Sequence, residues 1–222
     1  MGTRLKPLTL EQPKSLMKVL GKPFLLYQLE LLKGQGLTEI LLCTGYLGEK
    51  IERHFGSGEG FGVNLKYSRE ERPLGTAGAL KKAQNLLRDP FFTLYGDSYV
   101  FVDFSALFRH FENKNKLALM SVYRNCDRYD DSNTVVIGEF VKRYSKKKKT
   151  PDMAYIDYGV NLFRKKVLDL VPEGDPCRLD DLFPRLIEIG ELLAYEVGER
   201  FYEIGSPQGL KDFEEFSRSA PA

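Results

Sequence analysis

The order of apolar and polar positions predicts that strands and helices alternate through the first half of the chain. Leucines spaced three and four residues apart predict a helix directly after Pro23, whose ring suits a first helical turn. A continuous apolar run predicts a strand covered on both faces, and a strict alternation predicts a half-exposed one. Helices are expected at 23–33 and 47–55, and strands at 39–44, 63–67 and 91–95.

The second half of the chain is richer in predicted strands. Strands are expected at 117–123, 133–137, 139–144 and 154–163, and helices at 77–87, 103–113, 165–170, 179–189 and 207–216. This order favours an α/β fold with a doubly wound sheet centred on parallel strands. In such sheets ligands bind at the carboxyl ends of the strands. Asp97 comes just after the apolar run at 91–95, so it is a candidate site residue.

Composition and charge exclude several classes of protein. The 222 residues suit one large α/β domain or two small ones, and we expect a single domain over 1–222. Lys and Arg number 33 against 31 Asp and Glu, which argues against non-specific nucleic-acid binding. No apolar run reaches the length of a membrane span, and without an apolar stretch behind Met1 we expect no signal peptide. We therefore expect a cytoplasmic protein with neither a nucleic-acid nor a membrane partner.

Residues at the start of the chain could bind a polyphosphate. Gly2 next to Thr3 and Arg4 would let backbone amides approach phosphate oxygens, with the Arg4 guanidinium as a bidentate donor. Lys14 adds a second cation ten residues later. On spacing alone, a disordered basic terminus explains these residues better.

Two further segments could carry chemistry. The glycine-punctuated turn at Gly75, before a predicted helix, could accommodate a flat ring, although an ordinary loop explains it equally well. Asp97 and Glu203 could together hold Mg²⁺ against nucleotide phosphates, because Mg²⁺ usually takes one or two protein carboxylates. The alternative for each acid alone is a solvated or helix-capping carboxylate. The neighbouring acids Asp180 and Asp181 are expected to cap a helix.

The motifs are most informative when they are taken in order. The chain carries G-T-R-L-x-P-L-T with P-K after it, then P-L-G-T-A-G-A-L, G-D-S, Y-G-V-N and E-I-G-S-P. This set resembles the sugar-1-phosphate nucleotidyltransferases, from Gly2 to about Phe216. The closing motif is most similar to the heptose-1-phosphate guanylyltransferase branch. The resemblance implies a Rossmann-like fold with a mixed sheet, and transfer of a nucleotidyl group from a nucleoside triphosphate to a sugar 1-phosphate.

The same resemblance implies roles for individual residues. Glu203 stands where the family usually has an aspartate, and Lys146 and Lys147 replace a usual Glu-Lys pair. The implied roles are a phosphate loop ending at Gly2 and Thr3, catalytic cations at Arg4 and Lys14, base recognition by Gly75, Thr76 and Ala77, a sugar pocket lined by Tyr158, Gly159 and Asn161, and Mg²⁺ held by Asp97 and Glu203.

The start of the chain departs from the family. Relatives begin with an apolar strand and a two-glycine turn, so we expect Met1 to be an internal methionine and the first strand and part of the glycine-rich loop to be missing. Two alternatives stay open. One is a non-catalytic nucleotide-binding or regulatory relative, and the other is a cytidylyltransferase that acts on a non-sugar phosphate. The nucleobase, the sugar and assembly into a homo-oligomer are also left open.

Overall fold

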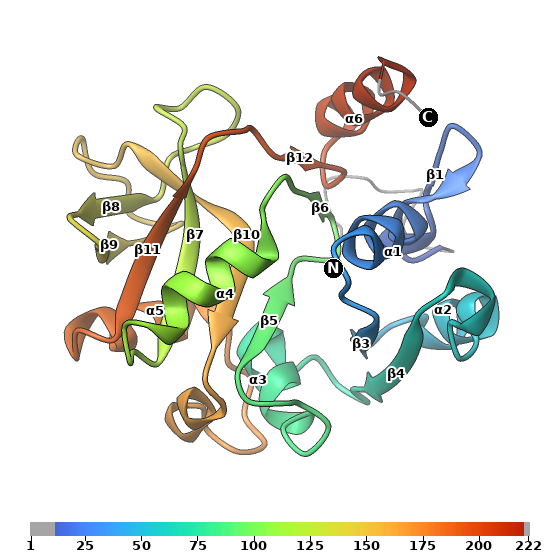
Figure 1. Cartoon of the computed structure of the whole chain (residues 1–222), viewed down its shortest axis with the longest axis horizontal. Coiled ribbons are helices and arrows are strands. Elements are labelled where there is room, and N and C mark those ends of the chain that lie inside the picture. The colour runs from blue at the N-terminus through green and yellow to red at the C-terminus, as the bar shows by residue number, and fades with distance from the viewer. Residues whose placement is uncertain (1–11, 220–222) are drawn as a thin grey trace. The chain divides into compact units, whose positions relative to one another are not determined.

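The computed structural model describes residues 12–219, which form two compact units (Figure 1). The first unit takes the chain up to Glu71, the segment Tyr95–Tyr99 and the chain from Phe201 onward. The second unit takes Arg72–Leu94 and Val100–Arg200. The expectation of a single domain over 1–222 stays a prediction. No helix within the described residues is both long and apolar enough to cross a membrane.

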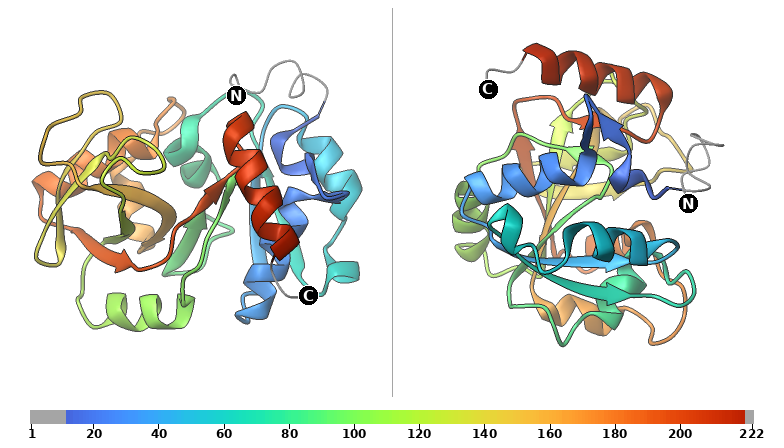
Figure 2. Two further views of the ribbon diagram at one scale, coloured as in Figure 1. Left: turned by 90° about the horizontal axis from the view of Figure 1, so that it is seen from above. Right: turned by 90° about the vertical axis from the view of Figure 1, so that its right-hand side faces the viewer.

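The first unit is built mainly from helices and short strands. Its parallel strands β3 and β4 run side by side, with α2 against them (Figure 2). In chain order its elements are the 3-10 helix η2 (Lys14–Leu16), β1 (Lys18–Val19), β2 (Lys22–Pro23), α1 (Phe24–Gly34), β3 (Glu39–Thr44), α2 (Gly48–Phe55), η3 (Glu59–Phe61), β4 (Asn64–Arg69), β6 (Ser98–Tyr99), β12 (Tyr202–Glu203) and α6 (Pro207–Ser219).

Two apolar clusters hold this unit together. The first joins η2, α1 and α2 to β4 through side chains such as Leu29 and Phe55, which are buried. The second joins β1 and α1 to α6. It consists of Val19, Phe24, Ile204 and Phe213, each with no exposed surface. Burial of this apolar area stabilises the short elements, which could not persist alone.

The second unit is built around a six-stranded sheet. The strand order is β5-β10-β7-β11-β9-β8, and β7 pairs with β11 in parallel while the other neighbours pair antiparallel. The elements of this unit are α3 (Gly75–Lys82), β5 (Phe91–Leu94), α4 (Phe104–Glu112), β7 (Ala118–Arg124), β8 (Thr134–Ile137), β9 (Phe140–Tyr144), β10 (Tyr155–Phe163), the 3-10 helix η4 (Lys165–Leu170), α5 (Leu179–Glu188) and β11 (Leu192–Val197).

Helices α4 and α5 cover opposite faces of this sheet, as Figure 1 shows. The Phe92 ring lies 5.2 Å from the Phe104 ring of α4. Phe91, the residue before it in β5, faces the other way. It contacts Phe163 of β10, which in turn stacks on Phe183 of α5. The sheet is therefore apolar on both faces.

The predicted elements are confirmed with a few corrections. The mixed sheet that the resemblance implies is confirmed, and the expected parallel centre is present as one parallel pair, β7 and β11, in the middle of the sheet. The strand at 39–44 was expected to be covered on both faces. Its apolar residues Ile40, Leu41 and Leu42 are only partly buried, because among the described residues β3 pairs with β4 alone.

Two predicted helices differ in extent or type. The helix expected at 77–87 begins at Gly75, because Cys177 O accepts the first-turn amides of Ala77 and Gly78. It ends at Lys82, where turns replace it. The helix expected at 165–170 is a 3-10 helix. Asp103 caps α4 as its position predicted, accepting a hydrogen bond from Ala106 N.

Candidate active site

Three side chains singled out from the sequence converge around Gly205 in the first unit. Lys14 Nζ lies 3.2 Å from Asp97 Oδ2, and the two groups form an ion pair. A methyl group on Gly205 would lie 2.7 Å from Glu203 Oε2. The same methyl group would lie 3.2 Å from Lys14 Nζ and 3.4 Å from Asp97 Oδ2. One ammonium and two carboxylates therefore surround a point that glycine leaves open.

A pair of short strands brings the two carboxylates together. Strand β5 ends at Leu94, and Asp97 lies in the turn that leads into β6. Strand β6 pairs antiparallel with β12, so Glu203 lies opposite Ser98. Ile204 N donates to Asp97 O at 3.0 Å and extends this pairing past Glu203. Two acids far apart in the sequence thus become neighbours through backbone hydrogen bonds.

A buried glutamine holds the turn that carries Asp97. Gln28 of α1 is 3% exposed, and its Nε2 donates to Tyr95 O at 2.8 Å and to Ser98 O at 2.7 Å. Both hydrogens of the amide are therefore used, one on each side of Asp97. The turn is fixed to α1, while the Asp97 side chain remains 41% exposed and open to a ligand.

The start of α6 orients the Glu203 carboxylate. Gly205 N donates to Oε2, and the Ser206 hydroxyl donates to Oε1. Gly209 N in turn donates to Ser206 Oγ at 3.0 Å. An anion at a helix N-terminus is stabilised by the free amides and the helix dipole. Glu203 is thus held in one orientation by the element that follows it.

The predicted base-reading segment docks on the start of α5 in the second unit. Gly75 has a φ of +73°, and a methyl group there would lie 2.5 Å from Cys177 O, so this position requires glycine. Ala77 N donates to the same carbonyl at 3.0 Å, and Leu179 N donates to Thr76 Oγ1 at 2.8 Å. These hydrogen bonds hold the segment in place, and they occupy the Ala77 amide and the Thr76 hydroxyl oxygen within the protein. Its role towards a nucleobase stays a prediction.

The predicted sugar-pocket residues of β10 lie in the interior of the second unit. Tyr158 is 1% exposed, its hydroxyl accepts from Phe101 N at 2.9 Å, and burial raises its pKa to about 12. Gly159 has a φ of +96° at a bulge between β10 and β7. Asn161 is fully buried, and neither polar atom of its amide has a partner within the described residues. Contact of these side chains with a sugar stays a prediction.

A buried acid beside this bulge was missed in the sequence. Asp157 is 8% exposed, and its Oδ1 accepts from Gly159 N at 3.0 Å. Asn133, which is also buried, accepts from Asp157 N at 3.0 Å through its Oδ1. A charged residue inside the apolar run at 154–163 was the available signal, because Asp is rarely buried without a specific reason.

A second cluster of polar side chains in the same unit surrounds Asp180. Its Oδ1 accepts from the Tyr144 hydroxyl at 2.8 Å. Burial opposes ionisation of Asp180, but Lys146, Tyr144 and Arg178 outweigh it and hold the pKa of the carboxyl below its usual value. Burial, followed by the nearby acids Asp157 and Asp180, raises the pKa of Tyr144. The expectation that Asp180 and Asp181 cap a helix holds for Asp181, whose Oδ2 accepts from Arg178 N at 3.0 Å.

The remaining predicted site residues, Gly2, Thr3 and Arg4, lie outside the described residues. Among residues 12–219 no cluster of three or more metal-ligating side chains is present. Cys43, Cys126 and Cys177 carry free thiols.

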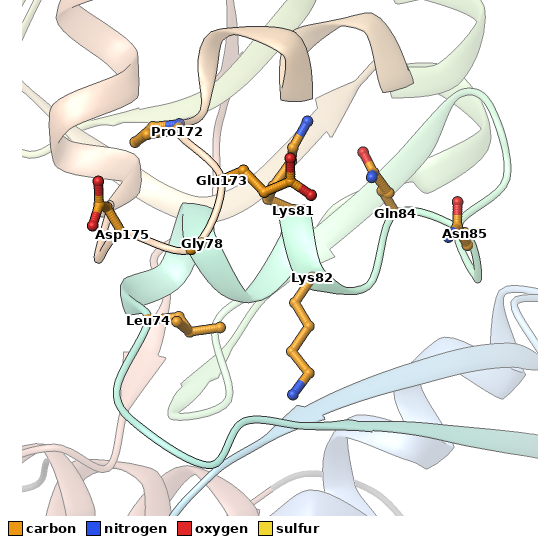
Figure 3. A pocket seen from close by; sticks show the side chains of 10 residues that line it. Leu74, Gly78, Lys81, Lys82, Gln84, Asn85, Pro172, Glu173 and Asp175 are labelled. Carbon is orange, nitrogen blue, oxygen red and sulfur yellow. The ribbon is translucent and has the colours of Figure 1, made fainter.

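A pocket of about 350 Å³ lies beside the Gly75 segment in the second unit (Figure 3). Leu74 and Gly78, on either side of that segment, contribute to its wall. Figure 3 shows the Lys82 side chain extending away from Glu173. The lining carries both charge signs and comprises Leu74, Gly78, Lys81, Lys82, Gln84, Asn85, Pro172, Glu173, Gly174 and Asp175.

Comparison with protein families identifies the chain. The family described as nucleotidyl transferase matches residues 1–219. The chain belongs to this family. Among its curated relatives, mannose-1-phosphate guanyltransferase beta-B of Xenopus laevis is 32% identical over 223 residues, covering 96% of this chain and 60% of the relative. Mannose-1-phosphate guanyltransferase of Saccharomyces cerevisiae is 30% identical, with the same coverage of both chains. The chain thus spans about 60% of the length of the curated relatives it matches.

Solved structures confirm the fold of this family member. A Bacillus anthracis protein assigned as a glucose-1-phosphate thymidylyltransferase superposes with a TM-score of 0.86 at 22% identity, covering 100% of this chain and 93% of the other. HddC of Yersinia pseudotuberculosis superposes with a TM-score of 0.81 at 24% identity, covering 98% and 95%. At these identities the likeness shows a mixed α/β nucleotidyltransferase fold. The resemblance inferred from the motifs, to the sugar-1-phosphate nucleotidyltransferases, is confirmed by these relatives.

The residues around Gly205 fit a divalent cation that binds together with phosphates. Mg²⁺ prefers oxygen ligands and commonly takes one or two protein carboxylates, with water and substrate phosphate in the other positions. Asp97 and Glu203 place two carboxylates close to a single point, and neither is fully buried. The Lys14 ammonium lies beside Asp97, and its role towards phosphates stays a prediction.

Proposed function

We propose that this chain transfers a nucleotidyl group from a nucleoside triphosphate to a sugar 1-phosphate, releasing pyrophosphate and a nucleotide sugar. The observation that carries the proposal is the convergence of Lys14, Asp97 and Glu203 around Gly205 in a chain of the nucleotidyl transferase family. A phosphate oxygen of the sugar forms a bond to the α-phosphorus of the nucleotide. The bond from that phosphorus to the oxygen bridging the β-phosphate breaks, and its electron pair leaves with pyrophosphate.

The chain's own residues lower the activation barrier of the transfer by neutralising phosphate charge. Both substrates are anions, so their approach is unfavourable without compensating cations. Lys14 would bind phosphate oxygens and hold the two reactants in line. When Mg²⁺ is bound by Asp97 and Glu203, it supplies further neutralisation of phosphate charge. Because Glu203 is already oriented by α6, it needs little reorganisation to serve as a ligand.

A guanine nucleotide is the donor that we propose. The curated relatives compared above are mannose-1-phosphate guanyltransferases, and HddC was also solved with GMP-PN. Base recognition is assigned to the Gly75–Ala77 segment and sugar recognition to the bulge of β10, where Asp157 and Gly159 lie. Mannose 1-phosphate and a heptose 1-phosphate are the first acceptors to test.

The test is a matrix of the common nucleoside triphosphates against sugar 1-phosphates, with pyrophosphate release as the readout. We expect GTP with one hexose or heptose 1-phosphate to give the highest kcat/KM. A choline-type phosphate is included as an acceptor for the cytidylyltransferase alternative. If no pair releases pyrophosphate above the rate without enzyme, the proposed function is wrong.

Replacement of Asp97 by Asn provides the first mutational prediction. The change keeps the size of the side chain but removes the charge that the proposal assigns to Mg²⁺. We expect Asp97→Asn to lower kcat by about a hundredfold or more while the thermal unfolding temperature stays within a few degrees. Asp152→Asn is the control, since Asp152 pairs with Arg143 on the surface of the second unit. An Asp97→Asn protein with normal turnover would remove Asp97 from the metal site.

One observation favours a second candidate, a non-catalytic nucleotide-binding relative. Both carboxylate oxygens of Glu203 already accept hydrogen bonds from the start of α6, so this acid has a structural role in addition to any catalytic one. Calorimetry separates the two candidates. Binding of GTP without turnover against any acceptor would support the second.

A further inference from the structure

The carboxylate of Asp180, in the first turn of α5, is the centre of a hydrogen-bonded cluster in the second unit. Its side chain is 19% exposed. Oδ1 accepts from the Tyr144 hydroxyl at 2.8 Å and pairs with Lys146 Nζ at 3.3 Å. Oδ2 accepts from Arg178 Nε at 3.1 Å and from Arg178 Nη2 at 2.6 Å. Asp180 therefore joins the end of strand β9 to the residue that precedes α5.

The residues next to Arg178 support the Gly75–Ala77 segment. Cys177 O accepts from Ala77 N at 3.0 Å and from Gly78 N at 2.9 Å, and Leu179 N donates to Thr76 Oγ1 at 2.8 Å. A methyl group on Gly75 would also lie 3.3 Å from Cγ of Arg178. Residues 177–179 thus form a platform on which this segment lies.

Asp180 links Tyr144 of β9 to Arg178 before α5, and these two residues differ in how firmly the surrounding structure holds them. Tyr144 is fixed, because β9 pairs with both β8 and β11, and its ring lies 5.0 Å from the Phe183 ring. The chain before the platform is an exposed loop over 172–176 with two prolines, whose Gly174 carbonyl accepts from Arg72 at 2.8 Å. Cys177 and Leu179 of the platform are buried, and Asp181 still accepts from Arg178 N, so loss of the Asp180 charge should loosen the platform at Arg178 and leave the strand in place.

We propose that Asp180 is a positioning residue for nucleotide binding, which ties the 177–179 platform to strand β9 and so holds the Gly75–Ala77 segment in place. The proposal rests on the proposed function, in which this segment contacts the base. Asp180 acts through Arg178 and the platform, without contact to the nucleotide. The link is charge-assisted on the Arg178 side, which makes it stronger than a neutral hydrogen bond.

Asp180→Asn tests the proposal through kinetics. The expected result is a KM for the nucleoside triphosphate about tenfold higher, the size expected when a hydrogen bond to a charged group is lost. The kcat and the KM for the sugar 1-phosphate should stay within about twofold, because Tyr144 and β9 keep their places. Tyr144→Phe removes the hydrogen bond from β9 and leaves the Lys146 and Arg178 contacts of Asp180, so it should raise the nucleotide KM by a smaller factor.

Asp152→Asn is the matched control for this experiment. Asp152 likewise accepts two hydrogen bonds from an arginine, at 2.8 Å and 2.7 Å from Arg143, but both side chains are 53% exposed. Its kinetics should match those of the wild type. Arg178 is 66% exposed, so water can hydrate its charge in Asp180→Asn and the fold should survive.

Amide hydrogen exchange without substrates provides a readout that does not depend on activity. In Asp180→Asn we expect faster exchange at the amides of Ala77, Gly78 and Leu179, and unchanged exchange in Asp152→Asn. Unchanged exchange at these amides together with an unchanged nucleotide KM in an active enzyme would overturn the proposal. If the wild type releases no pyrophosphate, the proposed function fails, and the exchange rates alone decide whether Asp180 holds the segment.

Discussion

At the scale of single residues, glycines decide which polar groups can meet. Gly205 leaves open the point that Lys14, Asp97 and Glu203 surround, and Gly75 allows the Gly75–Ala77 segment to approach Cys177 O. At Gly75 both the positive φ and the 2.5 Å approach to a carbonyl require glycine. At Gly205 only side-chain ends are close, so a larger residue would displace functional groups and leave the backbone in place.

Gly205→Ala should therefore separate activity from stability. The added methyl group would lie 2.7 Å from Glu203 Oε2, which has to move away from its bond to the backbone amide. We expect kcat to fall by about tenfold to a hundredfold, because catalytic groups must be held within a fraction of an ångström. The midpoint of chemical unfolding should change little. Pyrophosphate release and a urea titration of the same preparation provide the two measurements.

Gly198→Ala is the control for this variant. Gly198 is exposed, and an added methyl group would meet nothing within 4 Å. Its kcat should equal that of the wild type. Full activity in Gly205→Ala would show that the arrangement around Gly205 does not serve catalysis.

Individual residues also show which parts of the candidate site could be predicted from sequence motifs. Lys14, Asp97 and Glu203 were selected from the sequence, and the structure brings all three together. Asp157 and the wider role of Asp180 were missed. Their partners come from other parts of the chain, since Asn133 lies just before β8 and Tyr144 ends β9, and nothing in the local sequence indicates which residues will be neighbours after folding.

At the scale of elements, helix α6 supports the candidate site from the C-terminal end of the chain. Gly205 and Ser206, the two residues directly before α6, donate to Glu203, and the Phe213 side chain of α6 is fully buried. The Phe213 ring lies 5.1 Å from Phe24 of α1 and 5.0 Å from Tyr99 of β6. Packing of α6 and the position of the two acids are therefore coupled through the same short strands.

Phe213→Ala should weaken this coupling and lower the unfolding free energy of the first unit. Removal of a fully buried phenyl ring leaves a cavity and costs about 3–5 kcal/mol of unfolding free energy. We expect a lower midpoint in urea and a higher KM for substrates in the fraction that remains folded. Phe108→Ala, at a position on α4 that is 38% exposed, should cost less than about half as much. Equal losses in the two variants would contradict the assigned role of Phe213.

The elements themselves were largely predictable. Apolar periodicity and caps are local, so the helix at Phe24–Gly34 and the strand at Tyr155–Phe163 agree with expectation within a residue. The exposure of β3 and the early start of α3 were not predictable. The first depends on which strands pair with β3, and the second on a carbonyl, Cys177 O, that comes from a distant part of the chain.

At the scale of the whole molecule, stability should depend on pH through the ion pairs that folding assembles. The pKa of Asp180 is lowered in the folded state, because Lys146, Tyr144 and Arg178 outweigh its burial. A carboxylate with a lowered pKa contributes stability that is fully present above its unfolded pKa of about 3.9. That contribution is lost as the pH falls through the folded pKa.

The difference in unfolding temperature between the wild type and Asp180→Asn should therefore be largest near neutral pH. It should shrink as the pH is lowered below about 4. Exposed acids with lowered pKa values, such as Asp127 and Glu139, are common to both proteins and cancel in the comparison. Thermal unfolding followed by circular dichroism from about pH 7 to about pH 3 measures the difference. A difference that stays constant over this range would show that the Asp180 charge adds no stability.

The sequence by itself determined the element order, the family and the candidate phosphate-binding residues, because periodicity, capping and motif spacing are properties of short stretches of chain. Only the tertiary structure decided which strands pair in the sheet, that β12 brings Glu203 close to Asp97, and that Asp180 joins Tyr144 of β9 to Arg178. These features arise from pairing and packing between residues far apart in the chain. Such contacts depend on the free energy of the whole fold, which no local pattern records.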